Sequence, residues 1–155
     1  MTPIKMTVLC YIQNKDKTLM LHRTKKQNDI HEGKWNGIGG KIEYNESPED
    51  AIKREAMEET GLSIKPILKG LVTYPQTNND EYCMVFVFTA KKFTGKLIEC
   101  NEGDLEWIKT KEIPKLNLWE GDKIFLPLLK KKGFFSGKIT YNKERVIDEK
   151  INYYR

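Results

Sequence analysis

Several features are scarce in this 155-residue sequence, and each scarcity excludes a class of protein. The three cysteines, Cys10, Cys83 and Cys100, are an odd number and form no CxxC pair, so we expect neither structural disulfides nor a zinc site. No run of residues approaches the ~20 apolar residues of a membrane span. The N-terminus also lacks the charged and apolar regions of a secretory signal. We therefore expect a protein of the reducing cytoplasm without membrane contact.

The charge pattern argues against one further class of partner. Arginines interleaved with aromatic residues are absent, which argues against binding to polymeric nucleic acid. The net charge of +5 suits a smaller anionic ligand without identifying it. The run Lys130–Lys131–Lys132 is interpreted as the solvated end of a helix. The length is that of one ordinary domain, expected over residues 1–155, and the sequence does not predict its oligomeric state.

Residue patterns predict strands in runs and two helices, which is typical of a layered α+β domain. Strands are expected at residues 4–13, 18–23, 62–74, 82–92 and 105–109, and a closing hairpin at 134–141 and 144–153. Residues 24–34 are expected to form a polar loop. The glycines of residues 35–40 allow the backbone to approach a ligand closely. The second helix, expected at 122–132, is interrupted by Pro127.

The first helix is the most informative segment. Ser47 is a good N-cap, Pro48 suits the first helical position and Gly61 is the expected stop. Between them, three glutamates have the spacing i, i+3, i+4, which places them on neighbouring rows of one face: Glu55, Glu58 and Glu59.

These glutamates continue the apolar side of the helix instead of opposing it. Ala51 lies four residues before Glu55, whereas a helix built only for solubility has its acids on the far side. Carboxylates crowded against a packed face resist ionising together, and a dication removes that conflict. Ligands that are all oxygen suit Mg²⁺ or Mn²⁺. The alternative is an ordinary solvated helix with pairs such as Arg54–Glu58.

The segment 40–62 resembles the Nudix box: Gly, five residues, Glu, seven residues, Arg-Glu, an aliphatic residue, any residue, Glu-Glu, any residue, Gly, an aliphatic residue. The fixed positions in register are Gly40, Glu46, Arg54, Glu55, Glu58, Glu59 and Gly61. Leu62 fits the last aliphatic position, and Ala56 departs mildly from the first.

The resemblance implies a fold and a reaction. The fold is an α/β/α sandwich of the α+β class, with a mixed, curved sheet and the box forming a loop-helix-loop. The enzyme would hydrolyse nucleoside diphosphates linked to another group, with Mg²⁺ or Mn²⁺ as cofactor. Glu55, Glu58 and Glu59 would bind metal together with the Gly40 carbonyl, and Glu55 or Glu59 would act as the base. Glu46 and Arg54 would orient these ligands.

Further segments are similar to the MutT-like subgroup that hydrolyses oxidised purine nucleoside triphosphates (8-oxo-dGTPase type). These segments are 33–41, 107–108, 113–114, 119–122 and 125–137. By this resemblance Asn36 would hydrogen-bond the purine, Trp119 would stack on it, and Asp122 would recognise its edge. Glu102 falls where the subgroup has another glutamate near the metal.

Alternatives remain for three of these residues. Asn36 also fits a turn, Trp119 a core aromatic position and Glu102 a loop. Before Asp122 the subgroup has a second acid where this chain has Gly121, which puts the preference for oxidised bases in question.

The sequence therefore leaves three hypotheses for the function. The first is a Mg²⁺-dependent pyrophosphohydrolase that converts a purine nucleoside triphosphate, oxidised or not, to monophosphate and pyrophosphate. The second is a Nudix hydrolase acting on a nucleotide sugar or an RNA 5′ end. The third is a non-catalytic nucleotide-binding regulator. The intact Glu58–Glu59 pair favours an enzyme.

Overall fold

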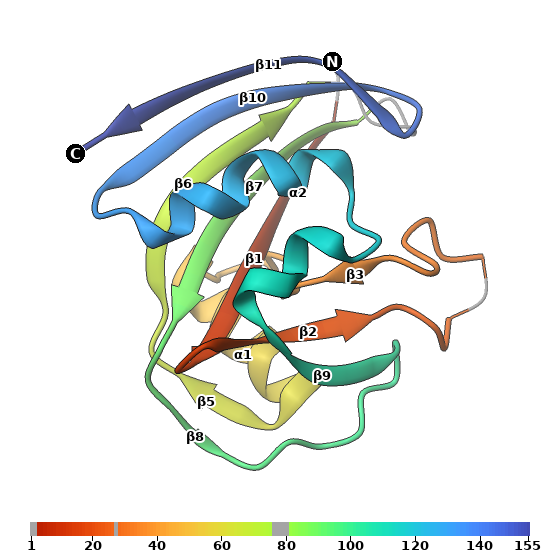
Figure 1. The fold of residues 1–155 in the computed structure, drawn as a ribbon, viewed down its shortest axis with the longest axis vertical. Coiled ribbons are helices and arrows are strands. Elements are labelled where there is room, and N and C mark those ends of the chain that lie inside the picture. The colour runs from red at the N-terminus through yellow and green to blue at the C-terminus, as the bar shows by residue number, and fades with distance from the viewer. Residues whose placement is uncertain (1–2, 27, 76–80) are drawn as a thin grey trace.

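A mixed sheet of nine strands forms the middle layer of the computed structural model, which describes residues 3–26, 28–75 and 81–155 (Figure 1). Its strands are β1 (Ile4–Asn14), β2 (Lys17–His22), β3 (Trp35–Asn36), β4 (Ile38–Lys41), β6 (Ile67–Tyr74), β7 (Tyr82–Ala90), β9 (Asp104–Lys109), β10 (Phe134–Asn142) and β11 (Arg145–Tyr154). Their order is β11-β10-β6-β7-β1-β2-β3, with β4 beside β1 and β9 beside β2. Strand β1 runs parallel to β7, and β10 parallel to β6.

Helices and a small second sheet complete the described chain. They are the helices α1 (Pro48–Thr60) and α2 (Glu120–Phe125), the 3-10 helices η1 (Thr110–Lys115) and η2 (Leu126–Lys130), and the strand pair β5 (Leu62–Ile64) with β8 (Phe93–Gly95). None of the helices in the described ranges is long and apolar enough to cross a membrane.

Alternating side chains on the central strands supply two apolar cores, one on each face of the sheet. Cys10 and Ile12 of β1 pack in the same core as Ile52 of α1. Tyr11, which lies between them in sequence, packs instead in the core that contains Phe125 of α2. Successive side chains of a strand point to opposite faces, so this alternation puts α1 and α2 on opposite sides. The expected α/β/α sandwich is confirmed.

Helix α1 begins and ends where the sequence predicts. The Ser47 hydroxyl accepts a hydrogen bond from the Asp50 backbone N–H (3.0 Å), and the Asp50 carboxylate accepts one from the Ser47 N–H (3.1 Å). Gly61 ends the helix in the left-handed region (φ 79°) and donates its N–H to the Met57 carbonyl. The carboxylate-bearing helix is therefore a well-capped unit.

Two expectations differ from the structure. The predicted strand 62–74 is broken at Pro66, which has no N–H to donate, and its first part pairs with β8 instead of the main sheet. The second helix is shorter than predicted: α2 covers Glu120–Phe125, and a 3-10 helix that contains Pro127 follows it. The glycine-containing segment expected to approach a ligand supplies β3 and β4, with Gly37 between them.

The predicted loop 24–34 is irregular over its described residues, and Gln27 lies outside them. The loop leads into β3, and strand β4 pairs with β1 and contacts helix α1. This arrangement positions the candidate site.

Candidate functional site

Arg54 is the centre of a network of carboxylates on α1 and the loop before it. Its Nε and Nη2 atoms donate to both oxygens of Glu46, at 2.7 and 3.0 Å, in a two-pronged pair. Its Nη1 atom donates to Glu55 (2.8 Å) and to Glu58 (3.3 Å). The hydrogen bond from Arg54 holds the pKa of Glu46 below its usual value. The structure therefore brings together the predicted supporting pair and two of the predicted metal ligands.

Glu55 lies against Gly40 at the end of β4. A Cβ atom built on Gly40 would meet the Glu55 carboxyl at 2.5 Å, so only glycine leaves the carboxylate this close to the strand. Burial raises the pKa of Glu55 and outweighs the opposing effect of Arg54.

Glu59 is the most buried carboxylate of the site, at 8% exposure. One of its oxygens accepts a hydrogen bond from the Gly39 N–H over 3.2 Å. Burial, followed by a hydrogen bond with Glu102 and the charges of Glu102 and Glu55, raises the pKa of Glu59 to about 9. Glu102, predicted from a distant segment, is therefore beside Glu59.

The predicted ligands do not all converge on one point. Glu58 has a side chain that is 60% exposed, whereas those of Glu55 and Glu59 face the strand. Across the described ranges, no three acidic, histidine or cysteine side chains are grouped so that they could hold a metal ion. Arg54 supplies the positive charge between Glu55 and Glu58 instead.

The chemistry of the donor set nevertheless fits a divalent cation. The charges of Glu102 and Glu55 help to raise the pKa of Glu59, and those of Glu58 and Glu102 help to raise the pKa of Glu55. A bound dication would lower these pKa values and satisfy carboxylates that are costly to ionise next to one another. Oxygen donors of this kind suit Mg²⁺ or Mn²⁺.

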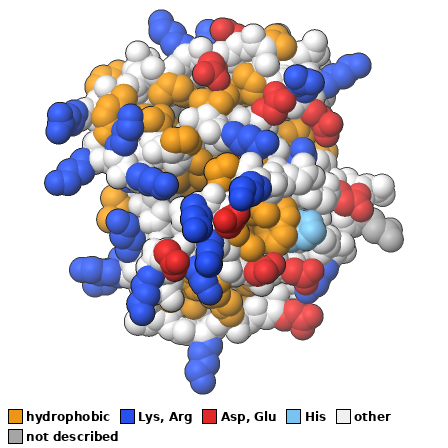
Figure 2. Space-filling model, viewed as in Figure 1, with side chains coloured by type: hydrophobic (Ala, Val, Ile, Leu, Met, Phe, Trp, Pro, Cys, Tyr) orange, Lys and Arg blue, Asp and Glu red, His pale blue; other side chains and the backbone are white. Residues whose placement is uncertain are grey.

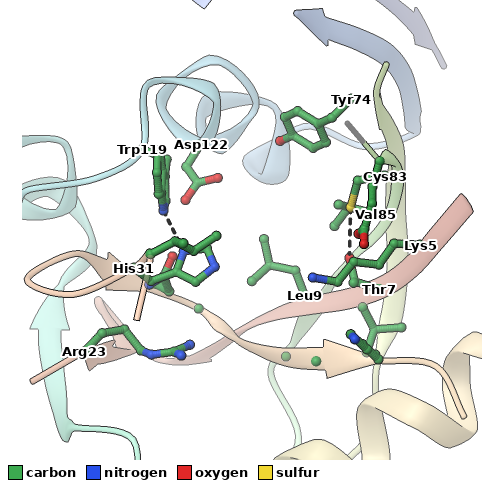
Figure 3. Close-up of a pocket in the computed structure, with 18 of the residues that line it drawn as sticks. Lys5, Thr7, Leu9, Arg23, His31, Tyr74, Cys83, Val85, Trp119 and Asp122 are labelled. Atoms are coloured by element: carbon green, nitrogen blue, oxygen red, sulfur yellow. Dashed lines mark hydrogen bonds between the residues drawn. The ribbon is translucent and has the colours of Figure 1, made fainter. Parts of the chain in front are cut away.

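Figure 3 shows a cavity of about 320 Å³. Its wall includes Gly39 and Gly40, which contact Glu59 and Glu55. The three predicted substrate-binding residues, Asn36, Trp119 and Asp122, all line it. The Asn36 side-chain nitrogen is buried and has no hydrogen-bond partner among the described residues. A buried donor without a partner is costly, and a ligand acceptor would satisfy it.

Asp122 and Trp119 project into this cavity from the start of α2 (Figure 3). Burial raises the pKa of Asp122 to about 7, and the charge of Lys34 opposes that rise in part. The Lys34 ammonium lies 4.9 Å from the centre of the Trp119 ring. The ring of Trp119 is half-buried and faces the cavity, which argues against the alternative of a core aromatic.

Sequence reasoning missed several residues of the same cavity. Trp119 donates its indole N–H to Nδ1 of His31, which lies in the loop 24–34 (2.7 Å). Arg23 pairs with Asp29 of that loop (2.7 Å) and with Glu102 (3.6 Å). Figure 3 shows His31 and Arg23 below Trp119. The polar composition of the loop predicts exposure, and only its tertiary contacts reveal a wall of the cavity.

Lysine and arginine side chains project over much of the face drawn in Figure 2. Among the described residues, four cations line the cavity, Lys5, Arg23, Lys41 and Lys143, against the two acids Glu81 and Asp122. Positive charge at a concave site attracts anions. The cavity is therefore suited to a ligand that carries several negative charges and one flat, polar group.

Comparisons with known proteins agree with this geometry. The model of the NUDIX domain family matches residues 3–129. The mouse oxidized purine nucleoside triphosphate hydrolase is 33% identical over 123 residues, 79% of each chain. The uncharacterized Nudix hydrolase YvcI of Bacillus subtilis is 35% identical over 150 residues, 93% of this chain and 91% of its own. A solved MutT mutator protein from Bacillus halodurans superposes with a TM-score of 0.84 at 28% identity, covering 96% and 97% of the two chains.

These similarities confirm the family and fold that the motif at residues 40–62 predicts, and they confirm that the chain is an enzyme of this kind. The roles of individual site residues remain predictions.

Proposed function

Because this chain belongs to the NUDIX domain family, we propose that it is a pyrophosphohydrolase of purine nucleoside triphosphates that uses Mg²⁺ or Mn²⁺. The main observation in support of the proposal is that one wall of the cavity serves two half-sites, a base end and a phosphate end. Gly39 and Gly40 line the cavity that contains Asn36 and Trp119, and they also contact Glu59 and Glu55. A base in the cavity therefore directs its phosphates toward the carboxylates.

The base end of the cavity has the groups that a purine requires. The indole of Trp119 offers a flat surface for stacking, worth ~1–3 kcal/mol per base. Asn36 offers an unpartnered donor and Asp122 a carboxyl group. Polar groups placed in this way reject a ligand that leaves them unpaired. The similarity to a hydrolase named for oxidised purine nucleoside triphosphates supports a purine substrate. The polar groups of Asn36 and Asp122 suit a normal purine as well as an oxidised one.

The phosphate end has the groups that hydrolysis requires. A divalent cation held by the proposed ligands Glu55, Glu58, Glu59 and Glu102 would neutralise phosphate charge and make a bound water more acidic. The water oxygen attacks either the α-phosphorus or the β-phosphorus. The bond that breaks joins the attacked phosphorus to the oxygen that bridges the α- and β-phosphorus. Pyrophosphate and the monophosphate are the products.

Glu55 or Glu59 accepts the proton of the attacking water. Glu46 acts through Arg54, which it holds with both of its oxygens, and so keeps Glu55 in place. Groups that orient a ligand in this way typically contribute roughly 10–100-fold to metal affinity or activity.

A panel of substrates tests the proposal. Purine triphosphates, both normal and oxidised, are compared with a nucleotide sugar and a 5′-triphosphorylated RNA, with Mg²⁺ or Mn²⁺, and products are separated by chromatography. We expect monophosphate and pyrophosphate from a purine triphosphate and much slower turnover of the others. Cleavage of only the nucleotide sugar or only the RNA would show that the substrate is not a purine nucleoside triphosphate. No turnover of any compound would favour a nucleotide-binding regulator.

Two variants separate the half-sites. Glu58→Gln should lower kcat by orders of magnitude and leave folding unchanged, because this mostly exposed glutamate is a proposed metal ligand. Trp119→Ala should raise KM for purine substrates without altering affinity for Mn²⁺. Unchanged turnover in the first variant, or equal KM in the second, would reject the corresponding role.

A further inference from the structure

The C-terminal hairpin of β10 and β11 (Figure 1) lies outside the part of the chain that the family model matches, yet contacts of Glu120 attach it to the start of α2. The Val146 N–H donates to the Glu120 carboxylate (2.7 Å), and the Arg145 guanidinium pairs with the same carboxylate (3.0 Å). Glu120, which directly precedes Gly121, holds the hairpin against α2. The hairpin is therefore fixed to the helix that supplies Asp122 to the base end of the cavity.

Tyr141 of β10 brings a side chain of the hairpin into the cavity wall. It lines the cavity together with Tyr74, Trp119 and Asp122. Its ring stacks on that of Tyr74, with centroids 5.9 Å apart, and meets the ring of Trp119 edge-on at 6.1 Å. Three aromatic rings in contact leave little freedom for the Tyr141 side chain, so its hydroxyl has a defined position.

The Tyr141 hydroxyl has one hydrogen bond and can make another. Its oxygen accepts from the Gly121 backbone N–H over 2.6 Å. No described residue accepts the hydroxyl hydrogen, which leaves it available to a ligand. Burial raises the pKa of Tyr141, so that the group remains a neutral phenol and a donor.

Gly121 is required for this position of the hydroxyl. A Cβ atom built on Gly121 would lie 2.6 Å from the Tyr141 oxygen, closer than real Cβ contacts. Any larger residue at 121 displaces the phenol or breaks the hydrogen bond. The glycine that departs from the expected acid is therefore coupled to a tyrosine twenty residues later in the sequence.

We propose that Tyr141 is a specificity-determining residue, and that its hydroxyl, oriented by Gly121, donates a hydrogen bond to a carbonyl oxygen on the base of the bound purine nucleotide. The proposal rests on the function proposed above and deepens it. With Asn36, the cavity presents two donors beside the Asp122 carboxyl group. A guanine-type edge, with a carbonyl oxygen and N–H donors, complements this set, whereas the exocyclic amine of adenine places a donor against a donor.

The test compares Tyr141→Phe with the parent enzyme on GTP and ATP. Removal of one hydrogen bond predicts a loss of about tenfold in kcat/KM for GTP and a much smaller change for ATP. Gly121→Ala should produce the same selective loss by moving the hydroxyl. Tyr154→Phe, which removes a hydroxyl from an exposed tyrosine of the same hairpin, should leave both values unchanged.

Thermal unfolding and product binding distinguish a lost hydrogen bond from a disturbed fold. Tyr141→Phe should retain the unfolding temperature of the parent to within a few degrees, and GMP should bind it more weakly than the parent in tryptophan fluorescence, with AMP little affected. Equal losses for GTP and ATP, or no loss for GTP and GMP, would overturn the role of Tyr141. If the parent binds GMP but hydrolyses no nucleotide, the proposed function fails while the binding comparison still decides the role of Tyr141.

Discussion

The indole nitrogen of Trp119 donates a hydrogen bond to Nδ1 of His31 over 2.7 Å, across 88 residues of sequence. The two rings meet edge-on, at 5.6 Å between centroids. Nδ1 accepts only when it carries no proton, so the bond requires a neutral imidazole with its proton on Nε2. Burial, followed by the charge of Arg23, lowers the pKa of His31 and keeps the ring neutral. The loop 24–34 thereby holds the aromatic surface proposed to stack on the base.

The first prediction concerns this bond. His31→Ala should raise KM for purine triphosphates several-fold with little change in kcat, because the Trp119 ring loses the acceptor that orients it and the phosphate end is untouched. His31→Asn, whose side-chain oxygen lies near the position of Nδ1, should recover much of the loss. Steady-state kinetics on the parent and both variants measure this, and a fall in kcat alone would assign His31 to another role.

The second prediction concerns the pH dependence of stability in the protein without divalent cations. The pKa of Glu59 rises from its ordinary value of 4.5 to about 9, so the folded protein binds a proton that the unfolded chain releases. The stabilisation is fully present below pH 4.5 and is lost as the pH rises toward 9. The free energy of unfolding, measured by denaturant titration in a chelator, should therefore decrease across this range.

Two comparisons isolate the contribution of Glu59. Glu59→Gln should flatten the decrease, because the amide does not titrate. Addition of Mg²⁺ should stabilise the parent more at about pH 8 than at about pH 6, because the cation binds the ionised carboxylate. A parent stability that rises with pH over this range in chelator would contradict the buried position of Glu59.

The third prediction contrasts two neighbouring glycines. A Cβ atom on Gly39 would lie 2.0 Å from the Val8 carbonyl oxygen, which is backbone, whereas one on Gly40 would meet the movable carboxyl of Glu55. Gly39→Ala should therefore cost roughly 3 kcal/mol of stability or more. Gly40→Ala should cost less stability and reduce activity sharply by displacing Glu55. Thermal unfolding and kcat of both variants distinguish the two effects. Equal destabilisation of the two variants would contradict the prediction, because it would mean that β4 can shift to accommodate a Cβ atom at either position.

The fourth prediction concerns the support of the carboxylates. Arg54→Ala removes the group that contacts Glu46, Glu55 and Glu58 together. The affinity for Mn²⁺, measured by calorimetry, should fall about 10–100-fold, because Glu55 is no longer oriented. Lys53→Ala, on an exposed neighbouring residue of the same helix, serves as the control. An increase in affinity would mean that the guanidinium competes with the metal instead of orienting its ligands.

The sequence determined the part of this protein that depends on local spacing. The caps at Ser47 and Gly61 and the i, i+3, i+4 glutamates are properties of one continuous segment, because helix geometry relates neighbouring turns. The family and the sandwich fold followed from that segment. The broken strand at Pro66 and the shortened helix at Pro127 were harder to predict, because the pairing partner of a strand and the end of a helix depend on distant contacts.

The surroundings of each acid and each aromatic residue depend on contacts between elements that lie far apart in the sequence. Glu55, Glu58 and Glu59 share one helical face, yet the crossing of β4 buries Glu59 and leaves Glu58 exposed. The contacts of Trp119 with His31 and of Gly121 with Tyr141 join segments far apart in sequence, and no local pattern predicts them. Burial and hydrogen-bond partners arise from packing between elements. For that reason sequence patterns single out candidates such as Glu55, Asn36 and Trp119, whereas the contacts made by His31 and Tyr141 appear only in the tertiary structure.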